Sequence, residues 1–491
     1  MKRSLGVDIA IHLKIMFWVC LWVPSNTYIA KLLYGSFVLF TVVFVMSLLL
    51  AQLLYLVIEH FDLILFVNSL TTLTSNIKIL LIMTRFRFMK EELQDLIKNF
   101  NALRSNRKSV SESENKILET AEKESRVLTN GLLSGFITLF ILMVAKPLFV
   151  QYTSTHHSNS TDLCPERSFI MLSWYPWGTC STTIYAAIYV SQIYALFMII
   201  MQIAVYQTLN TSILIHIAAE VDIIYDKFIS VLNQNNRKIS EERNNKFPNL
   251  DIDTNRSKNN EKLKQCYALN KDIVCAETNS TALKNNHIEG IVGILDNVSV
   301  AYECVKDPIS NMFSNDYDKS EEEGEQEEEE EVYNRLIEIV KHHQSVFRFS
   351  EEVNNMFSPF YLFQFSTVII GLCFASFLAS MPSLDSETRM QFIIFTFLLM
   401  AQLLLPCWYG QRVTDQSERI RDAVYGCRWY DKSPRFKKAV QIIIMRCQRP
   451  ICFSVGGFAV ISRETWLSLI NFTYSLLAVL RQMDEDTLQE N

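Results

Sequence analysis

Five long runs without a charged residue determine what this chain can fold into. They are Leu32–Ile58, Val127–Ala145, Ser168–Ala219, Val353–Leu384 and Met390–Gln411. Each is longer than the roughly 18 apolar residues that mark a membrane-spanning helix. Charged residues make up only 20% of the chain, below the usual share of a soluble globular protein. The sequence therefore predicts an all-α membrane protein rather than several soluble domains.

We expect seven transmembrane helices. Five lie within the uncharged runs, at Leu33–Ile58, Gly131–Val150, Thr183–Ala218, Ser358–Ser380 and Met390–Tyr409. A further span, Leu63–Met83, carries only Lys78 near one end, where a lysine side chain can reach the lipid headgroups. The last span, Arg463–Leu480, gives about 30 Å of helix together with its flanks.

The distribution of Lys and Arg orients these helices. With the long connection 220–352 set aside, 24 of them precede the first span or lie in the connections 84–126 and 412–449, and 3 lie on the opposite side. Short loops rich in Lys and Arg stay in the cytoplasm. We therefore expect a cytoplasmic amino terminus and an outer carboxyl terminus. A G-protein-coupled receptor has the opposite orientation and is the weaker alternative.

The outer side carries the candidate covalent modifications. Cys164 and Cys180 lie in the same outer connection and can form a disulfide. Asn159 begins the Asn-Ser-Thr glycosylation sequon of that connection. No His-Glu-x-x-His, Gly-x-Ser-x-Gly or phosphate-binding glycine motif occurs. We expect no enzymatic activity, no cofactor and no metal site.

The outer halves of the second to sixth spans carry aromatic, methionine and hydroxyl side chains that suit a small volatile or lipophilic ligand. The candidate ligand-binding residues are Phe66, Ser69, Leu70, Phe140, Met143, Val144, Tyr185, Tyr189, Gln192, Phe392 and Phe395. Lipid-facing and helix-facing residues have the same composition, so packing without ligand contact is the alternative for each. Trp174, Tyr175 and Trp177 are interpreted as an interfacial aromatic belt.

The final span is more polar than the others. Ser462 is expected to cap its amino terminus, and Ser468, Asn471, Thr473 and Ser475 lie along it. Copies of such a helix around an axis can line a pore, with leucines near the outer mouth closing it by dewetting. An ordinary packed span is the alternative.

The carboxyl-terminal part carries motifs that together resemble the insect odorant receptor family. They are Cys407-Trp-Tyr-Gly410, Ser417 with Ile420, Ala423 and Tyr425, Cys427-x-Trp429-Tyr430, Phe436-Lys-Lys438, Gln448-Arg-Pro450, Gly456-Gly-Phe458, Ser462 and Tyr474-Ser475. The resemblance implies an odorant-gated, non-selective cation channel in the plasma membrane of olfactory neuron dendrites. It implies a tetramer built with odorant receptor coreceptor subunits.

The resemblance also implies roles for single residues. The last helix would line the pore, with Leu477 at the hydrophobic gate and Leu480 and Arg481 one turn beyond. Thr473-Tyr474 is followed after five residues by Leu480, where gustatory receptors and the coreceptor carry Gln. This departure favours a ligand-tuning subunit. A coreceptor-like or self-sufficient homotetrameric channel is the alternative.

These expectations divide the chain into seven parts, taken in chain order. They are a cytoplasmic or interfacial segment (1–32), the first four spans with an inner helical connection (33–232), a disordered Asn- and Glu-rich cytoplasmic insert (233–331), a helical extension with spans five and six (332–435), a cytoplasmic anchor helix and loop (436–461), the pore-lining helix (462–481) and an extracellular tail (482–491). The insert is expected to be disordered because it is strongly polar and ends in the acidic run Glu321–Glu331.

Overall fold

A computed structural model of the chain describes residues 12, 14–21, 28–58, 63–105, 111–157, 168–176, 181–246, 319–381, 384, 386–426 and 429–490. The chain divides into two compact units, one formed by Met1–Ser230 and Arg335–Asn491 and the other by Val231–Asn334. The described residues of the second unit belong to the ends of two long helices. The contacts and sites described below lie in the first unit.

The described part of the chain consists mainly of helices, which confirms the predicted all-α architecture. Their bounds are α2 Tyr28–Ile58, α3 Leu63–Phe88, α4 Lys90–Ser105, α5 Glu112–His157, α6 Thr182–Lys246, α9 Lys319–Ser380, α10 Ser386–Tyr425, the short 3₁₀ helix η1 Trp429–Asp431, α11 Pro434–Cys447 and α12 Arg463–Glu490. Every predicted span lies within one of them. Among the described residues, five helices are long and apolar enough to cross a membrane: α2, α5, α6, α9 and α10. The helices α3 and α12 are not among these five.

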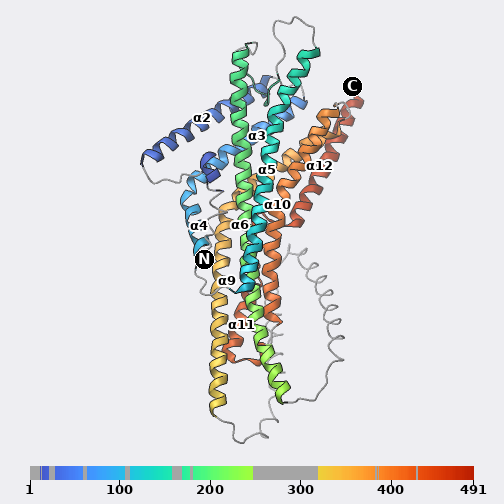
Figure 1. Cartoon of the computed structure of the whole chain (residues 1–491). Coiled ribbons are helices and arrows are strands. Elements are labelled where there is room, and N and C mark those ends of the chain that lie inside the picture. The colour runs from blue at the N-terminus through green and yellow to red at the C-terminus, as the bar shows by residue number, and fades with distance from the viewer. Residues whose placement is uncertain are drawn as a thin grey trace, which may run out of the picture. The chain divides into compact units, whose positions relative to one another are not determined.

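Helix α6 forms the centre of the first unit. Its side chains from Ala204 to Ile224 are almost all buried. Figure 1 shows α5, α6, α9 and α10 running beside one another. Side-chain hydrogen bonds join them: Ser125 meets Ser212 at 2.8 Å between α5 and α6, and Gln364 meets Gln207 at 3.3 Å between α9 and α6. A helix buried on every side explains why α6 has no single apolar stripe.

The longest helices extend beyond a bilayer. Helix α6 has 65 residues and α9 has 62. At 1.5 Å per residue, each is more than about 90 Å long, roughly three times the thickness of the hydrocarbon core. A large part of each helix therefore lies outside the membrane.

Both ends of the range 233–331, for which the sequence predicts disorder, are helical in the structure. Helix α6 continues to Lys246, and α9 already begins at Lys319, so the acidic run Glu321–Glu331 is helical. Extending an existing helix avoids the costly nucleation step, and Glu is a good helix former. Residues 247–318 lie outside the described part. Likewise α12 does not end near Arg481 but runs through the predicted tail to Glu490.

A short hairpin connects α11 to α12. Its strands β1 (Ser454–Val455) and β2 (Ala459–Val460) pair antiparallel, with Val455 opposite Ala459. Gly456 and Gly457 form the turn with φ of 60° and 79°, which glycine adopts without strain. Ser462 Oγ then accepts a hydrogen bond from Thr465 N at 3.0 Å, which confirms the predicted cap of α12.

Candidate functional site

Three polar side chains lie on one face of α6 near its amino-terminal end. Tyr185, Tyr189 and Gln192 are spaced i, i+4 and i+7, and all three are buried. The Tyr189 hydroxyl donates a 2.6 Å hydrogen bond to the Val144 carbonyl of α5. The Tyr185 hydroxyl donates to Gln151 Oε1 at 2.8 Å. The structure thus brings four of the predicted ligand-binding residues together where α5 meets α6.

The segment 168–176 folds back against these side chains. Gln192 Oε1 accepts hydrogen bonds from Ile170 N at 3.0 Å and Met171 N at 3.1 Å. Gln192 Nε2 donates to the Met171 carbonyl at 2.9 Å. One buried side chain therefore satisfies three backbone groups of a segment that has no helix or strand of its own, and it holds Met171 at 3% exposure.

Aromatic rings complete this group of side chains. We call it the outer wall, after the side of the membrane that the sequence predicts for it; it consists of Phe169, Tyr175, Tyr185, Tyr189 and Gln192. Phe169 packs on Tyr185 with ring centroids 5.3 Å apart, and Tyr185 lies 5.7 Å from Tyr189. Tyr175 lies 6.3 Å from Phe169, and its hydroxyl is 3.3 Å from Gln192 Nε2. Tyr175 is half-buried and packs within the segment, while Trp174 is exposed, and their interpretation as an interfacial belt stays a prediction. Trp177 lies outside the described residues.

Two amides near this wall were not among the predicted site residues. Asn76 Nδ2 of α3 donates to Gln52 Oε1 of α2 at 2.8 Å, and both side chains are at most 1% exposed. Gln52 Nε2 in turn lies 3.7 Å from the Met171 sulfur, and Trp174 N donates to the Ala51 carbonyl at 3.0 Å. The segment 168–176 is thus held by α2 as well as by α6. The sequence signal that could have identified Gln52 and Asn76 is that each is an amide side chain within an apolar run.

The remaining predicted ligand residues lie in several environments. Ser69 is 1% exposed, and its hydroxyl has no hydrogen-bond partner among the described residues. Leu70 and Phe140 are half-buried, and Phe140 packs edge-on against Phe197 at 5.9 Å. The side chain of Phe66 is outside the described part.

Helix α10 contributes less to this wall than predicted. Phe392 is buried in a cluster with Ala375, Leu378 and Leu384, which joins it to the end of α9. Phe395 is exposed, as is Met143 of α5. The structure therefore does not collect all predicted residues around one point. Cys164, Cys180 and Asn159 lie outside the described residues.

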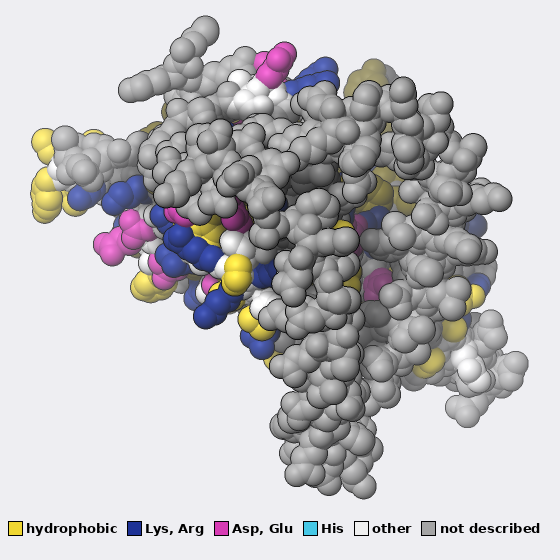
Figure 2. Space-filling view, turned by 90° about the horizontal axis from the view of Figure 1, so that it is seen from below, with side chains coloured by type: hydrophobic (Ala, Val, Ile, Leu, Met, Phe, Trp, Pro, Cys, Tyr) yellow, Lys and Arg dark blue, Asp and Glu magenta, His cyan; other side chains and the backbone are white. Residues whose placement is uncertain are grey.

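A second polar region joins α5, α6 and α9 far along the helices from the outer wall. Lys227 Nζ lies 3.4 Å from Glu114 Oε1, and His342 Nε2 lies 3.2 Å from Glu220 Oε2. Figure 2, the view from below, shows Lys and Arg side chains beside Asp and Glu among the described residues. Charged side chains such as those of Lys227, Glu114 and Glu220 suit a part of the bundle outside the lipid.

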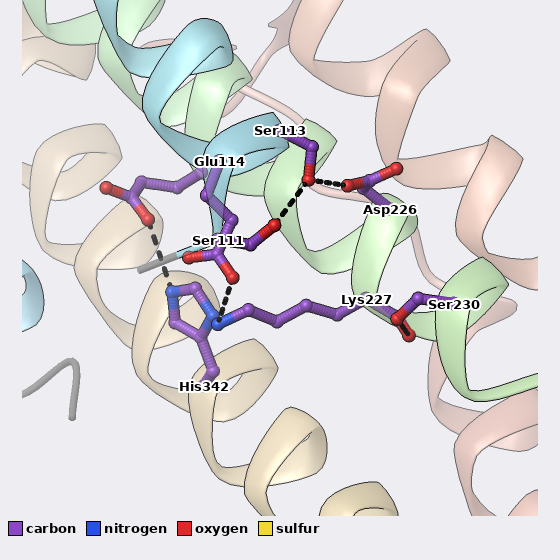
Figure 3. Close-up of polar contacts among 8 residues, drawn as sticks. Ser111, Ser113, Glu114, Asp226, Lys227, Ser230 and His342 are labelled. Atoms are coloured by element: carbon purple, nitrogen blue, oxygen red, sulfur yellow. Dashed lines mark hydrogen bonds and ion pairs between the residues drawn. The ribbon is translucent and has the colours of Figure 1, made fainter. Parts of the chain in front are cut away.

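A hydrogen bond from a serine hydroxyl accompanies these ion pairs. Figure 3 shows Lys227 reaching toward Glu114, while the Ser113 hydroxyl donates to Asp226 Oδ2 of α6 at 2.8 Å. The start of α5 is therefore fixed to α6 by two polar contacts. No group of three metal-binding side chains occurs among the described residues.

Helix α12, the predicted pore helix, is fastened to α10. Trp466 Nε1 donates to the Met400 carbonyl at 3.2 Å, and Arg463 forms an ion pair with Asp415. Along α12 a partly polar face is covered by no described residue of this chain. Leu477 and Leu480 are half-buried, whereas Asn471, Tyr474, Ser475, Ala478 and Arg481 are exposed, as are the apolar Phe472 and Val479.

These features define an α-helical protein with several helices of membrane length, a wall of aromatic side chains and long helices that continue beyond their apolar parts. Large exposed apolar side chains along α2 and α5, such as Leu39, Leu142 and Phe149, suit contact with lipid. A family model described as 7tm Odorant receptor matches residues 62–275 and 291–474, most of the chain. The chain belongs to this odorant receptor family, whose members are receptors and not enzymes.

Curated relatives and solved structures agree with this assignment. Odorant receptor 85b of Drosophila melanogaster is 32% identical over 148 residues, 30% of this chain and 38% of that receptor. Odorant receptor Or2 of Anopheles gambiae is 28% identical over 154 residues, 31% of this chain and 40% of that receptor. The matched stretch thus spans well under half of either relative. The structure of olfactory receptor OR5 from Machilis hrabei in complex with eugenol matches with a TM-score of 0.67 over 97% of both chains. Its 12% identity makes this a likeness of fold.

Proposed function

We propose that this chain is a ligand-tuning odorant receptor subunit that opens a non-selective cation channel together with coreceptor subunits. The observation that carries the proposal is the outer wall of Tyr185, Tyr189 and Gln192 in a chain of the odorant receptor family. This wall offers aromatic faces and two hydroxyl oxygens that donate within the chain and can still accept a hydrogen bond, a combination that suits a small volatile with one polar group. Eugenol, bound to the structurally similar OR5, has this character.

The proposal includes a topology. All seven predicted spans would cross the membrane, and the bias of 24 to 3 in Lys and Arg favours a cytoplasmic amino terminus and an outer carboxyl terminus. In this orientation the Glu114–Lys227 region and α11 lie in the cytoplasm, and the segment 168–176 lies outside. The subunit would reside in the plasma membrane of olfactory neuron dendrites, with the ligand reaching the wall from the outer side.

Helix α11 supports assembly with other subunits. Its inner face is packed: Phe436 and Val440 are buried, and burial raises the pKa of the Cys447 thiol to about 11. Its opposite face leaves Ile442 and Met445 exposed at 55% and 61%. An exposed apolar pair on an extramembrane helix fits contact with a second subunit. We propose that α11 joins four subunits and that α12 lines the pore between them.

Charging this face is expected to abolish assembly. Ile442→Glu combined with Met445→Glu places two carboxylates in the interface without touching the packed face of α11, so copurification with the coreceptor should be lost. Lys437→Glu, on another face of α11, changes the net charge by the same amount and should leave assembly intact. Copurification from cells that express both chains measures this. Undiminished capture of the double variant would contradict the interface.

The function itself is tested by whole-cell current. Cells expressing this chain, with or without an insect coreceptor, are exposed to a volatile panel that includes eugenol while G-protein signalling is blocked. A fast cation current that needs the coreceptor and survives the block supports the proposal. Current from this chain alone would indicate a self-sufficient channel. Silence from a chain shown to reach the surface, or current abolished by the block, would contradict it.

A further inference from the structure

Helix α10 contains a backbone carbonyl that its own helix cannot satisfy. Pro406 lies within α10 and has no N–H group. In a regular helix the N–H of position 406 would donate to the carbonyl of Gln402, four residues earlier. The Gln402 carbonyl is therefore left without its helical partner in the interior of the bundle, where Leu403 and Pro406 are buried.

Two glutamines from other helices fill this gap. Gln207 Nε2 of α6 donates to the Gln402 carbonyl at 3.2 Å. Gln364 Nε2 of α9 approaches the same oxygen at 3.5 Å and Gln207 Oε1 at 3.3 Å. Both side chains are at most 1% exposed. Three helices thus meet at one hydrogen-bonded point, here called the glutamine latch and formed by Gln207, Gln364 and the Gln402 carbonyl.

The helices that supply the glutamines are fixed to each other next to the latch. Three residues along each helix, the Tyr361 hydroxyl donates to Asn210 Oδ1, and both side chains are buried. This second contact joins α6 to α9 and does not include α10. Helix α10 is therefore held at its proline by side chains of a pair of helices whose own contact is independent of it.

The latch divides α10 into two parts with different attachments. The outer part carries Gln391, which accepts a hydrogen bond from Lys146 of α5. The inner part carries Arg412, whose guanidinium lies 2.8 Å from Glu124 of α5, and Asp415, which forms the ion pair with the start of α12. Proline sites are where long helices bend. A change of bend at the latch would move the inner part, which holds the start of α12 through Asp415, relative to the outer part, whose Met400 carbonyl accepts a hydrogen bond from Trp466 of α12.

We infer that Gln207 and Gln364 are positioning residues for gating, and that α10 changes its bend at the glutamine latch when an odorant acts on the outer wall. The inference rests on the proposed function for its link to gating. The glutamines act through the Gln402 carbonyl and need no contact with the odorant. They set how readily α10 bends, because bending must break or rearrange hydrogen bonds that have no water to replace them.

A mutant cycle on the purified full-length chain tests the latch itself. Gln207→Leu with Gln364→Leu is made in the natural background and in Pro406→Ala. Alanine restores the helical N–H, so the Gln402 carbonyl no longer needs the glutamines. The leucine pair should clearly lower the melting temperature when the proline is present and lower it much less in the Pro406→Ala background. Equal losses in both backgrounds would overturn the latch.

Gln202→Leu is the matched control. Gln202 is also a fully buried glutamine of α6, but its Nε2 donates to the Val19 carbonyl at 3.0 Å, away from α10. Its loss should lower the melting temperature equally in both backgrounds. A dependence on Pro406 as strong as that of the leucine pair would show a general weakening of α6 and overturn the assignment.

Currents then test the link to gating. The probe is the most potent member of the volatile panel, applied to cells that also express the coreceptor. Replacing both glutamines by leucine should shift the concentration of this volatile that gives half-maximal current about tenfold, the change expected from one or two buried hydrogen bonds. The same replacement should shift this concentration much less in the Pro406→Ala background. An unchanged half-maximal concentration would overturn the gating role. If the natural chain conducts with no volatile, the proposed function fails, and the melting cycle still decides whether the latch exists.

Discussion

Gln192→Leu is expected to release the segment 168–176 from the outer wall. The leucine keeps the approximate size of the side chain but removes the acceptor for Ile170 N and Met171 N and the donor to the Met171 carbonyl. Each unpaired buried backbone group costs about 1–3 kcal/mol, so the total is on the order of 3 kcal/mol or more. We expect a large fall in the melting temperature of the detergent-purified protein and loss of the response to volatiles.

Tyr189→Phe is the matched control on the same face of α6. This substitution removes a single hydrogen bond, the one from the tyrosine hydroxyl to the Val144 carbonyl. The Val144 carbonyl itself remains part of the α5 helix. The expected cost is about 1 kcal/mol. Gln192→Leu should therefore be clearly the more damaging of the two. Melting curves that rank them the other way would show that Gln192 does not hold the segment.

Gly456→Ala is expected to displace the hairpin that leads into α12. A side chain there would sit at φ 60° and place its Cβ 2.8 Å from Leu362 Cδ2 and 2.9 Å from Leu362 Cβ. Left-handed backbone costs roughly 1–2 kcal/mol for a non-glycine residue, and overpacking a filled site costs about 1–3 kcal/mol more. The hairpin is tied to α9 by Gly456 N, which donates to the Ser358 carbonyl at 3.1 Å. Its displacement should therefore reduce surface expression and current together.

Gly457→Ala separates strain from collision. Gly457 has a similar φ of 79°, but a Cβ there meets nothing within 4 Å. This variant should lose only the strain energy, and its melting temperature should lie between those of the natural chain and Gly456→Ala. Equal melting temperatures for the two variants would mean that contact with Leu362 does not matter.

The helical architecture could be predicted from the sequence because uncharged runs of membrane length have few alternatives. The i, i+4, i+7 spacing of Tyr185, Tyr189 and Gln192 likewise predicts that they share one helix face, as they do. The path of the segment 168–176 could not be predicted. Its backbone is satisfied by a side chain of α6 and by the Ala51 carbonyl, and no local periodicity encodes partners so far away in the chain.

Other features depend on tertiary structure in the same way. The contact of Tyr175 with Phe169 could not be predicted, because it depends on the path of the segment 168–176. Polarity predicted disorder over 233–331, but helix extension from α6 and into α9 overrides composition at both ends. The glutamine latch could not be predicted from the sequence because Pro406 only frees a carbonyl, and which side chains reach it depends on the packing of three helices.

The most direct test of the proposed channel function asks whether this chain contributes to the ion pathway. Leu477→Cys is coexpressed with the coreceptor, and a positively charged thiol reagent is applied from outside during the current evoked by an active volatile. If α12 lines the pore, the reagent should suppress this current irreversibly, whereas the natural chain, with its exposed Cys452, should conduct unchanged. A current that persists undiminished, although the new cysteine is shown to be labelled, would contradict a pore-lining α12.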